Sequence, residues 1–360
     1  MLTIISFFRF AVARATTLQQ VQPATQILKE SPLDAVLGST SDIPSPQWAL
    51  KKGKNMPFHY NLENPVTINE SVQETAGRLA DCFYERSLDS NHKDGEAEAK
   101  CRTFCNTVFM VRLFEGKEPE TTVLEVQRLS GCCVQLRHER NAIVKAAKEG
   151  VTAMEKTRRN TIPDFLLKLI EPPTLEETKL SMKQLVNELT KTSSSRESQS
   201  IQLDLLSSMT DREKSNVENC YKIAKMILEE NIFQIRSICF NMLDSGASDE
   251  ISNSIRTRIL LTFANCLECL ESNKTLSGVL ESDNFFSQEF YPNLVKELEK
   301  CKCPHSAFLI SKSLTHLLKN STSLRGDGQQ ELFKRTVAWG QTSHKKLYTE
   351  ATAATRVLDC

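Results

Sequence analysis

Cysteines and histidines are the residues of this sequence that could do chemistry. The first candidate for a catalytic pair consists of the adjacent Cys132 and Cys133 with the nearby His138. A catalytic cysteine needs a neighbouring base and a lowered thiol pKa. Cys132 and Cys133 follow a Ser130–Gly131 turn signal and begin a short predicted strand, so one should face the core and the other should face outward. A straight strand would carry His138 away from Cys132. We therefore expect no catalytic pair here.

A zinc site is the second chemical option. Enough ligands for a tetrahedral site occur in two segments: Cys266, Cys269, Cys301, Cys303 and His305. However, Cys266 and Cys269 lie inside a helical pattern, and Cys-x-Cys is an unusual ligand pair. The sequence also lacks a P-loop, a dinucleotide fingerprint, a Ser-His-Asp elbow and a His-Glu zinc motif. We expect buried structural cysteines, no metal, no cofactor and no catalytic residue.

Composition narrows the class of protein further. The 360 residues contain 45 Lys+Arg and 45 Asp+Glu, so no net charge attracts nucleic acid, and no RNA-binding sheet motif appears. The 12 cysteines occur largely at apolar positions, which is typical of a reducing compartment. No stretch has the length of a transmembrane helix. These features favour a cytoplasmic protein that does not bind nucleic acid.

The N-terminal segment, residues 1–56, shows no sustained period and is predicted to be mostly disordered. Residues 1–29 contain no acidic residue and carry Arg9, Arg14 and Lys29 among several Ser and Thr residues. That composition matches a mitochondrial or plastid transit peptide, which is the alternative to a cytoplasmic location.

A small α+β domain is expected over residues 57–155. A helical period follows Asn69, and residues 90–100 resemble a polar loop. Strands are predicted at 104–116, 121–129 and 132–137, and a helix at 139–150, where Gly150 provides a stop. The predicted order is α-β-β-β-α, with a three-stranded antiparallel sheet and helices on one face.

A basic cluster falls at the end of this domain. Its members are Arg128, Arg137, Arg140, Lys145 and Lys148. Such a cluster could bind phosphoinositide, another anionic lipid or an acidic peptide. Because Glu125, Glu139 and Glu149 are interleaved with these cations, a solvated surface without a ligand is the favoured interpretation.

The remainder, residues 162–360, is predicted to be helical. Amphipathic periods with short polar breaks occur at 175–189, 198–209, 213–229, 231–244, 248–271, 286–300, 304–319 and 328–358. On the first of these helices the expected buried stripe includes Leu175 and Met182. Many helices joined by short loops indicate a stack of helical hairpins, an α-solenoid. The predicted fold is thus mainly α, with the small α+β domain ahead of the solenoid.

Two resemblances accompany these patterns. NIFQIRSICFNML (231–243) and SNSIRTRILLTFANCL (252–267) resemble the second helix of HEAT or armadillo repeats. Residues 68–150, through Arg128, Ser130 and Gly131 of the turn, resemble the kinase-associated C-terminal α+β domain, although no kinase motif is present. The second resemblance implies binding of anionic phospholipid or of an intramolecular partner.

Together these features predict a non-enzymatic scaffold or adaptor whose helical domain binds a protein partner. The alternative is a peripheral membrane adaptor that binds anionic phospholipid through the basic face of the α+β domain.

Overall fold

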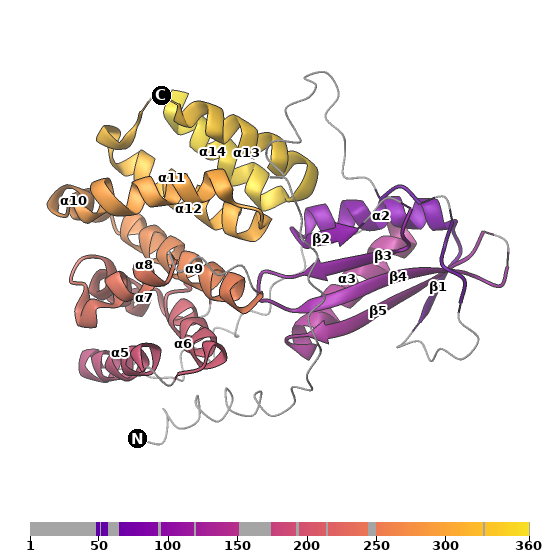
Figure 1. Cartoon of the computed structure of the whole chain (residues 1–360), viewed down its shortest axis with the longest axis horizontal. Coiled ribbons are helices and arrows are strands. Elements are labelled where there is room, and N and C mark those ends of the chain that lie inside the picture. The colour runs from indigo at the N-terminus through magenta and orange to yellow at the C-terminus, as the bar shows by residue number, and fades with distance from the viewer. Residues whose placement is uncertain are drawn as a thin grey trace.

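The computed structural model describes ten stretches of the chain, residues 48–50, 52–56, 65–92, 95–118, 120–150, 174–191, 194–213, 215–243, 250–326 and 328–359. A small five-stranded antiparallel sheet with its helices comes first, and a larger helical unit follows (Figure 1). Each unit has its own cluster of buried apolar side chains. We call residues 48–150 the α+β unit and residues 174–359 the helical unit.

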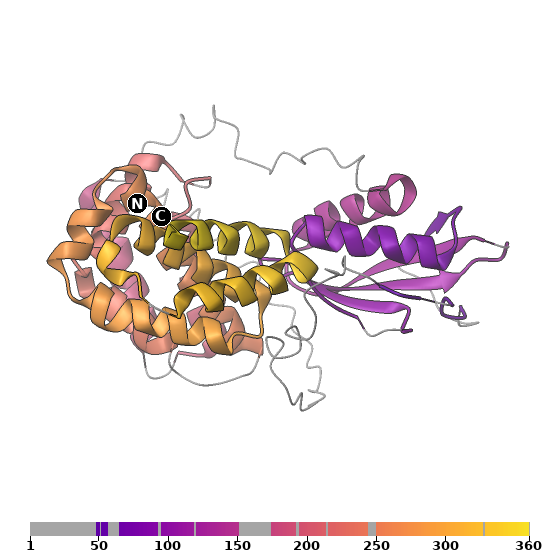
Figure 2. The ribbon, with the colours of Figure 1, turned by 90° about the horizontal axis from the view of Figure 1, so that it is seen from above.

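The α+β unit is built around an antiparallel sheet with the strand order β1-β5-β4-β3-β2. Its elements, in chain order, are β1 (Val66–Ile68), α2 (Val72–Glu85), β2 (Asp89–His92), β3 (Glu98–Arg102), β4 (Val108–Glu115), β5 (Thr122–Ser130) and α3 (Cys133–Glu149). Both helices lie on one face of the sheet (Figure 2). Residues Phe109, Val111 and Leu113 alternate along β4 and are fully buried in the core that α2 and α3 cover.

The sheet corrects the predicted three-stranded arrangement. Residues 132–137 are not a strand: Gly131 turns the chain with φ +89°, Cys132 is the N-cap, and α3 begins at Cys133, six residues earlier than expected. A side chain at Gly131 would meet the backbone of Thr107 at 2.6 Å, so this close turn requires glycine. Leu136 and Ile143 lie on one helical face and contact the core, which the short strand pattern had concealed.

Three strands of the sheet, β1, β2 and β3, were not predicted from the sequence. The predicted polar loop at 90–100 contains most of β2 and β3, where Ala99 and Cys101 alternate inward and are fully buried. Polar residues next to Ala99 and Cys101 in the chain concealed the alternation of buried and exposed positions. Such residues are accommodated because β2 and β3 lie toward the edge of the sheet. Trp48 and Leu50 also belong to the core, and the Trp48 indole donates a hydrogen bond to the Glu96 carbonyl at 2.9 Å. The prediction of disorder for residues 1–56 was therefore wrong at Trp48 and Leu50. Residues 1–47 lie outside the described residues.

The helical unit follows the predicted helical periods closely. Its elements are α5 (Leu175–Thr190), α6 (Arg196–Met209), α7 (Val217–Leu228), η2 (Ile232–Gln234), α8 (Ile235–Leu243), α9 (Glu250–Ser272), α10 (Leu276–Ser282), η3 (Phe286–Phe290), α11 (Tyr291–Lys300), α12 (Pro304–Asn320), η4 (Thr322–Leu324), α13 (Gln329–Ser343) and α14 (Lys345–Asp359). The predicted period at 328–358 is two helices, because His344 is extended with φ −162° and caps the second one. Leu175 is exposed, whereas Met182 is fully buried as predicted.

Long helices run side by side through the helical unit. The central α9 packs against α6, α7 and α12, and α12 packs in turn against α11 and α14. The chain thus progresses from α5 at one end of the unit to α13 and α14 at the other (Figure 1). Within the described ranges, every helix is too short or too polar to cross a lipid bilayer.

The two units meet where the N-terminal ends of α12 and α14 face the turn between α2 and β2. Lys345 forms an ion pair with Glu85 at 2.5 Å, and the backbone NH of Lys346 donates to the Ser87 hydroxyl at 3.0 Å. Phe104, from the turn between β3 and β4, lies edge-on to Phe308 of α12, with ring centres 5.8 Å apart. We call this contact region the junction.

Candidate functional site

The structure places the predicted basic cluster on the solvent side of α3. Arg137, Arg140, Lys145 and Lys148 fall on the arc opposite the buried Ala142, Ile143 and Ala146, and none of the four is buried. We call these four cations the α3 basic face. Arg128 is exposed at the end of β5, and its guanidinium donates to the Gly131 carbonyl at 3.2 Å, so it flanks this face across the turn.

Two of the acidic residues that were expected to neutralise this cluster point elsewhere. Glu139 is buried beneath α3 and is paired with Arg86 at 2.5 Å. Glu125 is fully buried in the sheet and pairs with Arg112 at 3.0 Å. Only Glu149 of the three is exposed. Two of the three carboxylates that interleave with the cations in the sequence are therefore paired with Arg86 and Arg112, which do not belong to the α3 basic face.

Apolar side chains are exposed beside these cations. Leu129 is 47% exposed at the end of β5, and Val134 is 55% exposed in the first turn of α3. The two flank the tight turn at Gly131. Exposed apolar residues next to cations are typical of surfaces that contact the interface of an anionic membrane.

The cysteine pair at this turn lies at the start of α3 and not on a strand. Cys132 is the N-cap of α3, and its backbone NH donates to the Thr107 hydroxyl at 3.2 Å. Cys133 and His138 lie five positions apart on the helix, about 140° around its axis, so the helix turns their side chains away from each other. The predicted strand at 132–137 was wrong, so the separation of Cys133 from His138 follows from the turn of a helix and not from the direction of a strand.

The five zinc-ligand candidates are divided by the fold. Cys266 and Cys269 are buried in α9, where the Cys269 thiol lies 3.9 Å from the Thr210 carbonyl. Cys301 ends α11, and its thiol donates to the Cys303 carbonyl at 3.3 Å. Burial raises the pKa of Cys301 to about 12, which keeps this thiol protonated. Cys303 and His305, in contrast, meet a residue that sequence reasoning missed.

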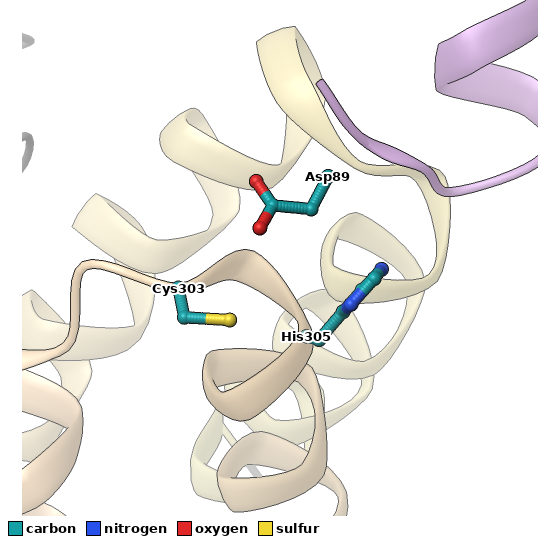
Figure 3. A group of neighbouring side chains, drawn as sticks. All are labelled: Asp89, Cys303 and His305. Atoms are coloured by element: carbon teal, nitrogen blue, oxygen red, sulfur yellow. The ribbon is translucent and has the colours of Figure 1, made fainter. Parts of the chain in front are cut away.

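That residue is Asp89, the first residue of β2. In the part of the chain that the structure describes, one carboxylate oxygen of Asp89, the Cys303 thiol and a His305 ring nitrogen all lie within 4.8 Å of one another. Figure 3 shows the three side chains converging at the junction, Asp89 from the α+β unit and the other two from the start of α12. His305 is buried, while Asp89 and Cys303 are half-buried.

The surroundings hold the His305 ring in one orientation. Its Nε2 lies 3.0 Å from the Ser87 carbonyl, which can only accept a hydrogen bond, so Nε2 carries the proton. The Phe104 ring packs edge-on at 5.5 Å, and the His344 ring at 5.1 Å. Burial lowers the pKa of His305, against the opposing effect of the Asp89 charge. His305 is therefore neutral near pH 7, with a lone pair on Nδ1.

Cys303 experiences opposing influences at the start of α12. Burial raises the pKa of its thiol, and the Asp89 charge acts in the same direction. The backbone NH groups of His305 and Ser306 act in the opposite direction and favour a thiolate. The cluster thus combines one oxygen, one sulfur and one nitrogen donor at a contact between two units.

His344, which packs on this cluster, predicts a sensitivity of the fold to acid. Its Nδ1 accepts from the Leu347 NH at 3.1 Å, and burial lowers its pKa to about 2, with His305 and Lys346 adding to the effect. An unfolded chain binds a proton near pH 6.5, which the native chain excludes, so stability falls as the pH drops below that value. At pH 5 this residue should cost about 2 kcal/mol.

The comparison that isolates this effect is His344→Asn, because asparagine can also accept a hydrogen bond at a helix N-cap. Urea unfolding at pH 7 and pH 5 should show a smaller acid-induced loss for the variant, by about 2 kcal/mol. Equal losses in the two chains would show that His344 does not titrate on unfolding.

Comparisons with known proteins add no relative: no family model, curated protein or solved structure matches this chain. The site residues above are therefore assigned from geometry and chemistry alone.

Proposed function

We propose that this protein is a non-enzymatic adaptor that binds an anionic phospholipid surface through the α3 basic face. The observation that carries this proposal is the segregation of charge on α3. Arg137, Arg140, Lys145 and Lys148 share the solvent side, whereas Glu139 is buried and paired on the opposite side. Each Lys or Arg close to an anionic membrane contributes about 1 kcal/mol to the free energy of binding, so the four cations together could attach the protein to such a membrane.

A lipid surface is favoured over an acidic peptide by the exposed apolar residues at the adjoining turn. Leu129 and Val134 could enter the boundary between headgroups and acyl chains, where burial of apolar area stabilises by about 25 cal/mol per Å². The resemblance of this region to the kinase-associated domain implies the same class of ligand.

In the same proposal the helical unit is an armadillo-like scaffold for a protein partner. The contacts of α9 with α6 and α12, and of α12 with α14, form a row of long helices, and shorter helices precede α9 and α12 in the chain. A row of this kind supports a repeat of helical groups. Exposed apolar side chains on its first two helices, Leu175, Leu180 and Ile201, are suited to contact with a protein.

Vesicle co-sedimentation of the full chain tests the lipid half of the proposal. We expect binding to phosphatidylserine-containing vesicles that weakens as salt rises, and little binding to phosphatidylcholine vesicles. Replacing Arg137, Arg140 and Lys145 together by Ala should reduce the apparent affinity by about 100-fold or slightly more, since about 1 kcal/mol is lost for each cation and about 1.4 kcal/mol is a tenfold change.

The matched control removes the same charge from the helical unit. Lys183, Lys296 and Lys300 are exposed there, and their joint replacement by Ala should leave vesicle binding within about twofold of the unmodified chain. If both triple variants bind equally well, the α3 basic face is not the binding surface. If neither they nor the unmodified chain binds vesicles at low salt, the lipid proposal is rejected.

A further inference from the structure

We propose that Asp89, Cys303 and His305 form a binding site for a divalent transition-metal ion of the zinc class, which links the α+β unit to the helical unit. The proposal is independent of lipid binding, because the α3 basic face and the junction share no residue. It rests on three donor groups that the fold brings together from two units.

The donor set itself selects the metal. A thiolate, an imidazole nitrogen and a carboxylate oxygen are the three ligand types that zinc uses in proteins. Magnesium and calcium prefer oxygen ligands only, so Cys303 and His305 argue against both. A thiolate and a carboxylate together carry two negative charges, which would balance a dication at this half-buried position.

The distances fit a site that needs only a small adjustment. Ligand bonds of about 2.0–2.3 Å in a tetrahedral site place donor atoms about 3.3–3.8 Å apart. The donor atoms of Asp89, Cys303 and His305 lie within 4.8 Å of one another, so closing around an ion requires shifts of about an ångström. Because Asp89 and Cys303 are half-buried, a fourth ligand such as water has access to the ion.

His305 is already oriented as a metal ligand. Metal-binding histidines usually donate their second ring NH to a carbonyl or a carboxylate, which fixes the ring and its tautomer. Here Nε2 donates to the Ser87 carbonyl at 3.0 Å, which leaves the Nδ1 lone pair available. The rings of Phe104 and His344 both pack edge-on against the imidazole.

The place of the cluster indicates what the ion would do. Asp89 begins β2 in the α+β unit, whereas Cys303 and His305 begin α12 in the helical unit. The ion pair of Lys345 with Glu85 crosses the junction near the surface, where solvent weakens such a contact. A metal ion bound to both units would fasten them with coordination bonds and make their unfolding cooperative.

A simpler role for Asp89 is to place a negative charge opposite the N-terminal end of α12, where helix dipoles favour anions. The two roles differ in one respect. Only a metal site makes the loss of Asp89 and the loss of Cys303 each weaken the binding of an ion.

The test uses the full chain, stripped with a chelator and then titrated with Zn²⁺ or Co²⁺. We expect one tightly bound equivalent, a thiolate-to-cobalt charge-transfer absorption, and a rise in the unfolding temperature with Zn²⁺. Cys303→Ser and Asp89→Asn should each weaken binding by about 100-fold or more, since loss of even an outer-shell partner costs about 10- to 100-fold. The exposed Cys133 provides the control, and Cys133→Ser should leave all three readouts unchanged.

Two results would overturn the proposal. One is that Cys303→Ser binds Co²⁺ with the same affinity and spectrum as the unmodified chain. The other is that Asp89→Asn lowers stability equally with and without Zn²⁺, which is the result expected if Asp89 only faces the helix dipole. Circular dichroism of each stripped variant verifies that it is folded, and should one variant fail to fold, the other decides the outcome.

Discussion

Replacing Arg112 by Met should lower the free energy of unfolding of the α+β unit by about 3–5 kcal/mol, the range found when one partner of a buried ion pair is removed. The strand register sets Arg112 of β4 between Glu98 of β3 and Glu125 of β5. Its guanidinium reaches Glu98 at 2.9 Å and Glu125 at 3.0 Å, and it also donates to Gln127 at 2.6 Å. Glu125 is fully buried, so without Arg112 its carboxylate loses the cation that compensates its desolvation.

The two tryptophans allow each unit to be followed separately. Trp48 belongs to the core of the α+β unit and Trp339 to the core of the helical unit. In a Trp339→Phe background, urea unfolding monitored by Trp48 fluorescence should report the loss caused by Arg112→Met.

Two controls accompany Arg112→Met. Adding Glu125→Gln to it should restore much of the stability, because the buried uncompensated charge is then gone. Glu218→Gln breaks an exposed pair with Lys222 and should cost less than about 1 kcal/mol. If Arg112→Met costs no more than Glu218→Gln, the network does not stabilise the sheet.

Replacing Phe290 by Ala should destabilise the helical unit by about 3–5 kcal/mol, the usual cost of truncating a buried phenylalanine. Phe290 is fully buried where η3 meets α11. Its ring centre lies 4.9 Å from that of Phe263, 5.7 Å from that of Phe285 and 6.0 Å from that of Phe286. These rings come from α9 and from the segment that joins α10 to α11, so truncation would leave a cavity between successive helices.

The reciprocal background, Trp48→Phe, makes Trp339 the reporter of this unit. There, Phe290→Ala should shift the unfolding midpoint strongly to lower urea. The matched control is Phe233→Ala, because Phe233 is 39% exposed on η2 and its truncation should cost about 1 kcal/mol or less. Equal unfolding midpoints for the two variants would show that the aromatic cluster around Phe290 does not contribute strongly to the stability of the helical unit.

Features that depend on local periodicity could be predicted from the order of the residues alone. Met182 and Leu185 recur at helical spacing and are buried on one side of α5. The strands β4 and β5 are rich in β-branched and aromatic residues, and both were predicted. The cations of α3 were also found from the sequence, because adjacency along a helix maps directly onto its surface.

Which of those residues lie together depends on contacts between elements that are distant in the chain. Glu139 and Glu125 seemed to neutralise the basic cluster, but their partners Arg86 and Arg112 lie on other elements, and pairing across a sheet or between helices leaves no local pattern. Asp89 carried no signal at all, since β2 is short and polar and its contact with Cys303 and His305 depends on how one unit packs on the other. Long-range packing fixes the charge of a surface and the composition of a ligand cluster, because both depend on which side chains meet in space and not on their order in the chain.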